Sequence, residues 1–112
     1  MKFAAIAIAA VAVVSAGSAF AAERVSDVDY LRASRCKGLA TTLTGVVDAG
    51  SIDAYLKAAR TGRQAAVYDR ADAEYNKAKR EARSEDRRAR LTQELTEGCQ
   101  AYVAGPSALA TR

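Results

Sequence analysis

The two cysteines are the residues of this sequence whose type most directly implies chemistry. Cys36 and Cys99 lie far apart and form no C-x-x-C pair of the kind found in thiol redox sites. The chain has no histidine, so a zinc site on two cysteines would need carboxylates to complete it. In an oxidising compartment an even pair of cysteines usually forms a disulfide. The sequence therefore predicts a Cys36–Cys99 disulfide, with no metal and no cofactor.

A second spacing is of the kind used in catalysis. Ser34 and Lys37 match S-x-x-K, which serine acyl-transfer enzymes use, but the two further motifs of those enzymes are absent. The lack of histidine also removes the commonest general base. Two carboxylate pairs match no calcium-binding loop and are interpreted as cap and surface charges, namely Asp27/Asp29 and Asp69/Asp72. We predict no catalytic residues and expect a protein that is not an enzyme.

The first residues have the three-part layout of a secretory signal peptide. Lys2 precedes a continuous apolar stretch from Phe3 to Val14, and small residues at Ala19 and Ala21 suit cleavage before Ala22. An uncleaved membrane anchor is the alternative, but the stretch is rich in alanine and ends in serine and glycine. We therefore predict a signal peptide over 1–21, a single helical domain over 22–105 and a flexible tail over 106–112. The mature protein is expected in the periplasm or outside the cell, without a stable membrane span.

The composition past this segment is helical. Alanine, arginine and leucine are frequent, there is one proline, and no β-branched run resembles a strand. Ser26 predicts the cap of a first helix from about Asp27 to Thr44, and Ser51 the cap of a second. Ser84, followed by two acidic residues, predicts the cap of a last helix that carries Leu91, Leu95, Cys99 and Tyr102. The expected fold is all-α, a small helical hairpin or three-to-four-helix bundle with one disulfide.

The disulfide also constrains the middle of the chain. If residues 52–83 formed one straight helix, the two cysteines would lie roughly 16 Å apart along the bundle, given the rise per residue. Their Cα atoms must instead lie about 5.5–6 Å apart. The apolar pattern also changes phase near Gly62. We therefore predict a break between about Arg60 and Arg63.

The segment from Lys77 to Arg90 is strongly basic. Its positive residues form a predicted surface for an anionic partner: Lys77, Lys79, Arg80, Arg83, Arg87, Arg88 and Arg90. Lys77 can pair with Glu81, and Asp86 with Arg90, at i, i+4 spacing. An exported protein rarely meets nucleic acid, so the expected partner is an unknown protein or an anionic surface of the envelope. The same charges also suit a solvated helical hairpin.

Small residues and tyrosines line the helix that leads to this basic segment. Ala71, Tyr75, Ala78 and Ala82 form a seam with heptad-like spacing, which can pack within the chain or mediate self-association. The five tyrosines, at 30, 55, 68, 75 and 102, are expected to supply much of the core.

One short stretch resembles a known family. The stretch Cys99-Gln-Ala-Tyr102-Val-Ala-Gly105 resembles the C-x-x-Y-x-x-G segment of small exported immunity proteins that block toxic cell-wall amidases. That resemblance implies an immunity or inhibitor protein that binds a single enzyme. The function favoured by the residues themselves is a non-enzymatic periplasmic or envelope binding protein, an adaptor or chaperone-like factor that uses the basic segment.

Overall fold

The computed structural model describes residues 25–104, in which all regular secondary structure is helical and no β-strand occurs. Its elements are α2 (Asp27–Thr42), α3 (Ala49–Ala58), α4 (Ala65–Ala82), α5 (Glu85–Gln93), the π-helical turn η2 (Glu94–Gly98) and α6 (Gln100–Val103). The predicted all-α class with one disulfide is confirmed. The predicted signal peptide, its cleavage site at Ala19, Ala21 and Ala22, and the 106–112 tail lie outside the described residues. None of the described helices is long and apolar enough to cross a membrane.

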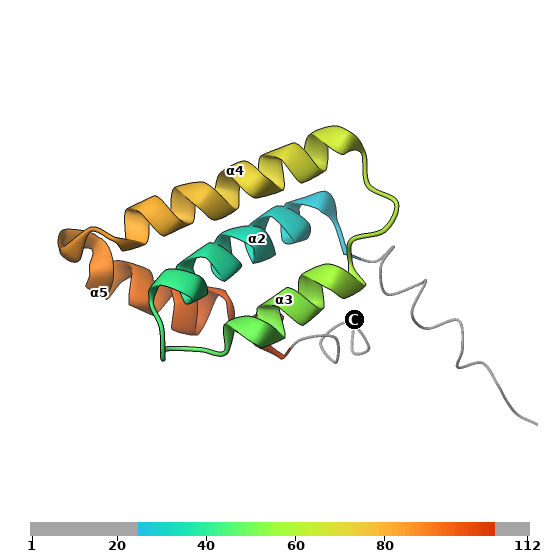
Figure 1. The fold of residues 1–112 in the computed structure, drawn as a ribbon. Coiled ribbons are helices and arrows are strands. Elements are labelled where there is room, and N and C mark those ends of the chain that lie inside the picture. The colour runs from blue at the N-terminus through green and yellow to red at the C-terminus, as the bar shows by residue number, and fades with distance from the viewer. Residues whose placement is uncertain (1–24, 105–112) are drawn as a thin grey trace, which may run out of the picture.

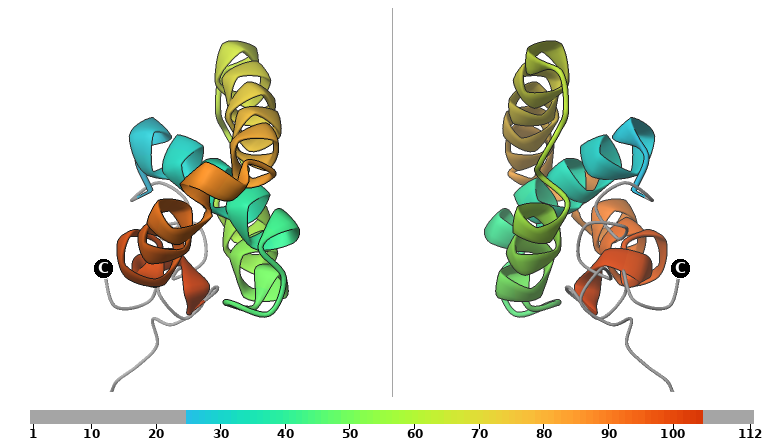
Figure 2. Two further views of the ribbon diagram at one scale, coloured as in Figure 1. Left: turned by 90° about the vertical axis from the view of Figure 1, so that its left-hand side faces the viewer. Right: turned by 90° about the vertical axis from the view of Figure 1, so that its right-hand side faces the viewer.

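Helix α2 is the centre of the fold (Figure 1). Helix α4 runs along one side of it and α3 along the other, while α5 turns back beneath α2 and leads to α6 beside α3. The end-on views in Figure 2 show α3 and α4 diverging from α2 in different directions. The chain therefore builds two separate interfaces on one central helix.

The interface between α2 and α4 is unusually close at Gly38. A Cβ atom built there would lie 2.4 Å from the carbonyl oxygen of Tyr75 and 2.9 Å from the Cβ of Ala78. Three alanines on the facing side of α4 are buried: Ala71, Ala78 and Ala82. These three alanines of the predicted seam therefore pack on α2 within the chain, whereas Tyr75, the fourth residue of the seam, is half-buried.

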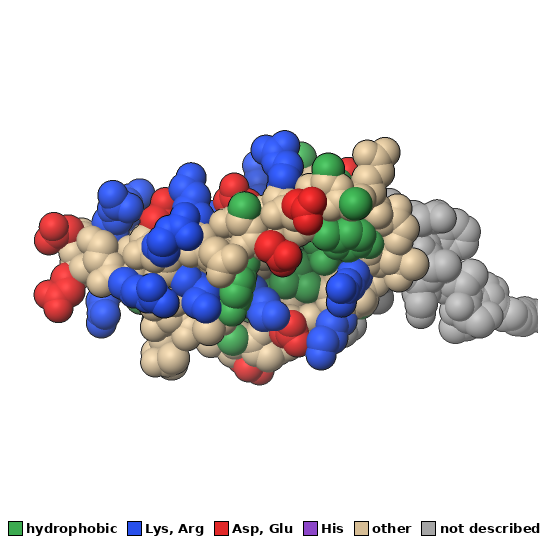
Figure 3. Space-filling model, turned by 45° about the horizontal axis from the view of Figure 1, so that its top comes forward, with side chains coloured by type: hydrophobic (Ala, Val, Ile, Leu, Met, Phe, Trp, Pro, Cys, Tyr) green, Lys and Arg blue, Asp and Glu red, His purple; other side chains and the backbone are tan. Residues whose placement is uncertain are grey.

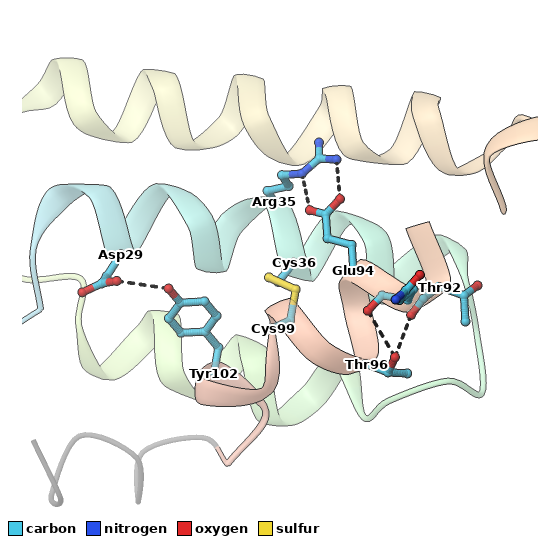
Figure 4. Close-up of a disulfide and its surroundings, with 9 residues drawn as sticks. Asp29, Arg35, Cys36, Thr92, Glu94, Thr96, Cys99 and Tyr102 are labelled. Carbon is cyan, nitrogen blue, oxygen red and sulfur yellow. Dashed lines mark hydrogen bonds and ion pairs between the residues drawn. A yellow bond between two sulfur atoms is a disulfide. The ribbon is translucent and has the colours of Figure 1, made fainter. Parts of the chain in front are cut away.

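The other side of α2 is tied to the C-terminal helices. Cys36 and Cys99 form the predicted disulfide, with Cα atoms 5.9 Å apart. Both residues are buried, with exposed fractions of 4% and 1%. The rings of Tyr55 and Tyr102 meet edge to face with centroids 5.0 Å apart. The Tyr102 hydroxyl donates to the carboxylate of Asp29 at 3.1 Å (Figure 4). Covalent, aromatic and hydrogen-bonded contacts thus hold this side together.

The helix boundaries confirm some predictions and correct others. Ser26 caps α2 as predicted, and its side chain accepts a hydrogen bond from the Asp29 backbone at 3.0 Å. The predicted break is confirmed, since the chain between α3 and α4 turns at Gly62 with φ of +83°. The cap of α3 is Asp48 and not Ser51, because the Asp48 carboxylate reaches the Gly50 backbone at 2.9 Å. Ser84 precedes α5 without making a capping side-chain bond.

The last predicted helix is interrupted. A π-helical turn over Glu94–Gly98 separates α5 from α6, so the residues expected on one continuous helix lie on three successive elements. Such turns are rare and occur mostly as single-turn bulges inside α-helices. The turn here directly precedes Cys99.

Candidate functional site

The basic end of the molecule is the surface where α4 meets α5. Its cations are those predicted from the sequence: Lys77, Lys79, Arg80, Arg83, Arg87, Arg88 and Arg90. All are exposed except Lys79, which is half-buried with its Nζ 5.0 Å from the centroid of the Tyr75 ring. Figure 3 shows Lys and Arg side chains spread over the half of the molecule that carries this end, with acidic side chains at its tip. We call these seven residues the basic end.

Two acidic residues near the basic end, Glu81 and Glu94, are turned toward α2. Arg35 Nη1 donates to Glu81 at 2.9 Å, and its Nε and Nη2 donate to the two oxygens of Glu94 at 2.6 and 3.0 Å (Figure 4 shows the Glu94 pair). These hydrogen bonds raise the pKa of Arg35, and the bond from Arg35 holds the pKa of Glu81 below its ordinary value. Arg35 thus joins α2, α4 and η2.

This arrangement overturns the local pairing expected from the sequence. Glu81 pairs with Arg35 across the fold and not with Lys77, and Arg90 forms no ion pair with Asp86. Within residues 25–104, none of the seven cations of the basic end lies within ion-pair distance of a carboxylate. The six exposed cations therefore direct their charge to solvent, whereas Lys79 lies beside the Tyr75 ring.

A groove between α3 and α4, with α2 as its floor, is the second candidate site. It has a volume of about 430 Å³. Each helix presents one stripe to it, spaced by three, four or seven residues, which is one face of an α-helix. The lining residues are Tyr30, Ser34 and Lys37 of α2, Asp53, Leu56 and Lys57 of α3, Arg60 of the connecting loop, and Tyr68, Ala71, Asp72 and Tyr75 of α4.

Charges inside the groove are organised around Asp53. Lys37 Nζ lies 2.6 Å from one carboxylate oxygen, and Lys57 Nζ lies 3.2 Å from the other. The hydrogen bond from Lys37, supported by the one from Lys57, lowers the pKa of Asp53. Lys37 also lies 5.6 Å from the centroid of the Tyr75 ring, which places a cation beside an aromatic face.

Tyrosines form the aromatic part of the groove. Tyr30 and Tyr68 meet edge to face with centroids 6.0 Å apart, and burial raises the pKa of Tyr30. The Tyr68 hydroxyl donates to the Arg60 carbonyl and accepts from the Arg63 backbone at 3.3 Å. Arg63 itself donates to Asp27 at 2.6 Å and stacks over Tyr30. The loop between α3 and α4 is thereby fastened to the tyrosines.

The S-x-x-K residues both lie in this groove, yet each has another bonding partner. The Ser34 hydroxyl donates to the Tyr30 carbonyl at 3.0 Å, one turn back along α2. The Lys37 ammonium group donates to Asp53. A serine nucleophile needs a base within hydrogen-bond reach, and here both groups make structural hydrogen bonds. Within residues 25–104, no three or more Asp, Glu, Cys or His side chains are placed to hold a metal ion.

The groove was not predicted from the sequence, although its signals are present. Tyr68, Ala71 and Tyr75 have helical spacing, but that spacing equally predicts a buried seam. Whether such a stripe is covered depends on how far apart α3 and α4 lie, which sequence periodicity does not encode.

The stretch that resembles immunity proteins is used inside the fold. Cys99 forms the disulfide, and Tyr102 packs on Tyr55 and bonds to Asp29. Gly105 lies outside the described residues. Both Cys99 and Tyr102 are buried.

Comparison with known proteins yields no relative: no family model, curated protein or solved structure matches this chain. The functional argument therefore depends on the two surfaces themselves.

Proposed function

We propose that this chain is a non-enzymatic binding protein of the bacterial envelope, an adaptor that holds an acidic partner protein through the basic end. The observation that carries the proposal is the one-sided use of charge where α4 meets α5. Arg35 draws Glu81 and Glu94 to the inner face, and the outer face carries the cations of the basic end, which outnumber the exposed acidic residues Glu85 and Asp86 there. Such a surface favours fast, electrostatically guided association with a negative partner.

The disulfide supports the location in this proposal. A bond between Cys36 and Cys99 forms readily in the periplasm or outside the cell and is rare in the cytosol. Its burial protects it from reductants. Export by the predicted signal peptide accounts for this oxidised state.

The composition of the basic end favours a protein partner over a lipid surface. A helix that lies on a membrane pairs its basic face with large apolar side chains. The large apolar residue of α5, Leu91, is fully buried, and the apolar residues near the turn are alanines. Without an apolar anchor, binding rests on charge and is weakened by salt.

The proposal is tested by crosslinked affinity capture from the native envelope with a pair of charge-matched variants. The double variant Arg87→Glu/Arg88→Glu reverses two exposed charges of the basic end. The control, Arg32→Glu/Arg70→Glu, makes the same change in net charge at exposed positions elsewhere on α2 and α4. We expect the first to lose its crosslinked partner and the control to keep it, with both folded by circular dichroism. Equal capture by the two variants would reject the basic end as the docking surface.

A further inference from the structure

The two walls of the groove between α3 and α4 carry opposite charges. Lys57 and Arg60 lie one turn apart at the α3 wall, and both are exposed. Asp72, also exposed, lies on the α4 wall between Tyr68 and Tyr75. In Figure 3 a patch of hydrophobic side chains is bordered by acidic side chains on one side and basic side chains on the other. An occupant of the groove therefore meets a positive and a negative wall at once.

Part of this charge is not paired with an opposite charge within the described fold, although the Arg60 guanidinium lies over the Tyr68 ring, 5.9 Å from its centroid. Lys37 of the floor and Lys57 of the α3 wall share the single carboxylate of Asp53, which leaves an excess of positive charge on this side of the groove. The Lys57 side chain is 75% exposed, so its ammonium group is accessible. Among the described residues, neither Arg60 nor Asp72 has an ion-pair partner. Both walls can thus accept a charged group from outside.

The space between the walls suits a flat ring. Tyr68 and Tyr75 are half-buried and lie two turns apart on α4, with the small side chain of Ala71 between them. Leu56 closes the opposite side and is buried. Aromatic rings pack on tyrosines edge to face or offset, and the volume falls within the range of about 300–1,000 Å³ typical of small-molecule sites.

The groove is also held in shape before any ligand arrives. The hydroxyl of Tyr68 is bonded to the Arg60 carbonyl and the Arg63 backbone, which fixes the ring and the loop together. Asp53 is held by two lysines. Side chains that are already ordered lose little entropy on binding.

From these features we propose that the groove binds a free aromatic amino acid as a zwitterion. The ring lies among Tyr68, Tyr75 and Leu56, the carboxylate faces Lys57 and Arg60, and the ammonium group faces Asp72. This site lies away from the basic end and is independent of the adaptor function proposed above. A peptide terminus carries the ring with one of the two charges, so a free amino acid is the ligand that satisfies both walls.

The ligand chemistry is tested by nuclear magnetic resonance titration of the purified, oxidised protein. The probes are L-phenylalanine, 3-phenylpropanoate, which lacks the ammonium group, and phenethylamine, which lacks the carboxylate. N-acetyl-L-phenylalanine and L-phenylalanine amide represent the two ends of a peptide. We expect saturable shifts of the Tyr68 and Tyr75 ring signals with L-phenylalanine. The affinities of the other four probes should be lower by about tenfold or more, since each lacks one charge-assisted contact. The same affinity for L-phenylalanine and for either peptide mimic would assign the groove to a peptide terminus, and no saturable shift would overturn the proposal.

Two charge reversals separate the contributions of the two walls. Arg60→Glu is expected to weaken L-phenylalanine and 3-phenylpropanoate about tenfold and to leave phenethylamine unaffected or tighter. Asp72→Lys is expected to produce the opposite pattern. Arg70→Glu, an exposed change on α4 at a position outside both the groove and the basic end, serves as the control and should leave all affinities unchanged. Equal effects of the two groove variants on every probe would show that these side chains do not contact the ligand's charges.

Discussion

The two interfaces of α2 are held together by different means. Toward α3 and α6, large side chains such as Tyr55, Ile52 and Leu39 are fully buried, and a disulfide ties α2 to the C-terminal turn. On the other side, the buried residues that α4 contributes are alanines, the helices approach closely at Gly38, and Arg35 supplies the polar link. One interface gains stability from volume and covalent closure, whereas the other depends on close backbone contact.

The difference teaches how a chain of this size can carry two binding surfaces. Alanines bury little apolar area, so the α4 interface contributes less hydrophobic free energy than the side with tyrosines and leucines. The side of α2 that carries the disulfide can therefore supply the stability that lets α4 keep charged residues on its outer face. Breaking each interface separately should show this asymmetry.

The largest effect is expected from removing the disulfide. The variant Cys36→Ala/Cys99→Ala frees a loop of 63 residues, and the chain-entropy model predicts a loss of about 4 kcal/mol in the free energy of unfolding. Guanidinium chloride unfolding followed by circular dichroism measures it, with the oxidised parent as the reference. An unchanged unfolding midpoint would mean that the tyrosine core alone stabilises this side.

A smaller but sharper effect is expected at the other interface. In Gly38→Ala the new Cβ would overlap the Tyr75 carbonyl and Ala78, so α4 must move away from α2 at a cost of about 1–3 kcal/mol. Gly98→Ala is the matched control, because its Cβ would lie 3.7 Å from the nearest side-chain atom, Glu94 Cγ. In thermal unfolding, the melting temperature should fall for Gly38→Ala and stay unchanged for Gly98→Ala. Equal melting temperatures would show that the helices can separate freely at this point.

The features of the fold that follow from neighbouring residues or from the disulfide could be predicted from the sequence, whereas the other contacts between distant helices could not. The break near Gly62 followed from the disulfide and the change of apolar phase, and the α2 cap followed from Ser26. These features depend on neighbouring residues or on a fixed covalent distance. The alanine seam on α4 was also recognised, but its partner, α2, was not.

The candidate sites show the same limit. The basic end is a run of charges, so it could be listed from the sequence, yet the inward pairing of Glu81 with Arg35 spans 46 residues and has no local signal. The groove needs three stripes on separate helices to meet. Asp48 replaced Ser51 as the α3 cap because both types cap well, and local propensity does not choose between them.

The smallest and most selective effect should come from the polar link itself. Arg35→Met retains much of the side-chain length and removes the charge that joins α4 and η2 to α2. Glu81 and Glu94 then lose their shared counter-charge, at a cost of about 1–2 kcal/mol near neutral pH, since all three groups are partly exposed. Urea unfolding measures this loss without added salt.

The pH dependence distinguishes this ionic link from simple packing. Because Arg35 lowers the pKa of Glu81, the link contributes fully above the ordinary glutamate pKa of 4.5 and is lost as the pH falls through the lower folded value. The difference in stability between the parent and Arg35→Met should therefore shrink when urea unfolding is repeated at pH values that fall below 4.5 and through the lowered folded pKa of Glu81. A difference that stays constant with pH would assign the role of Arg35 to its aliphatic stem, and the α4 interface would then resemble the disulfide side in depending on packing alone.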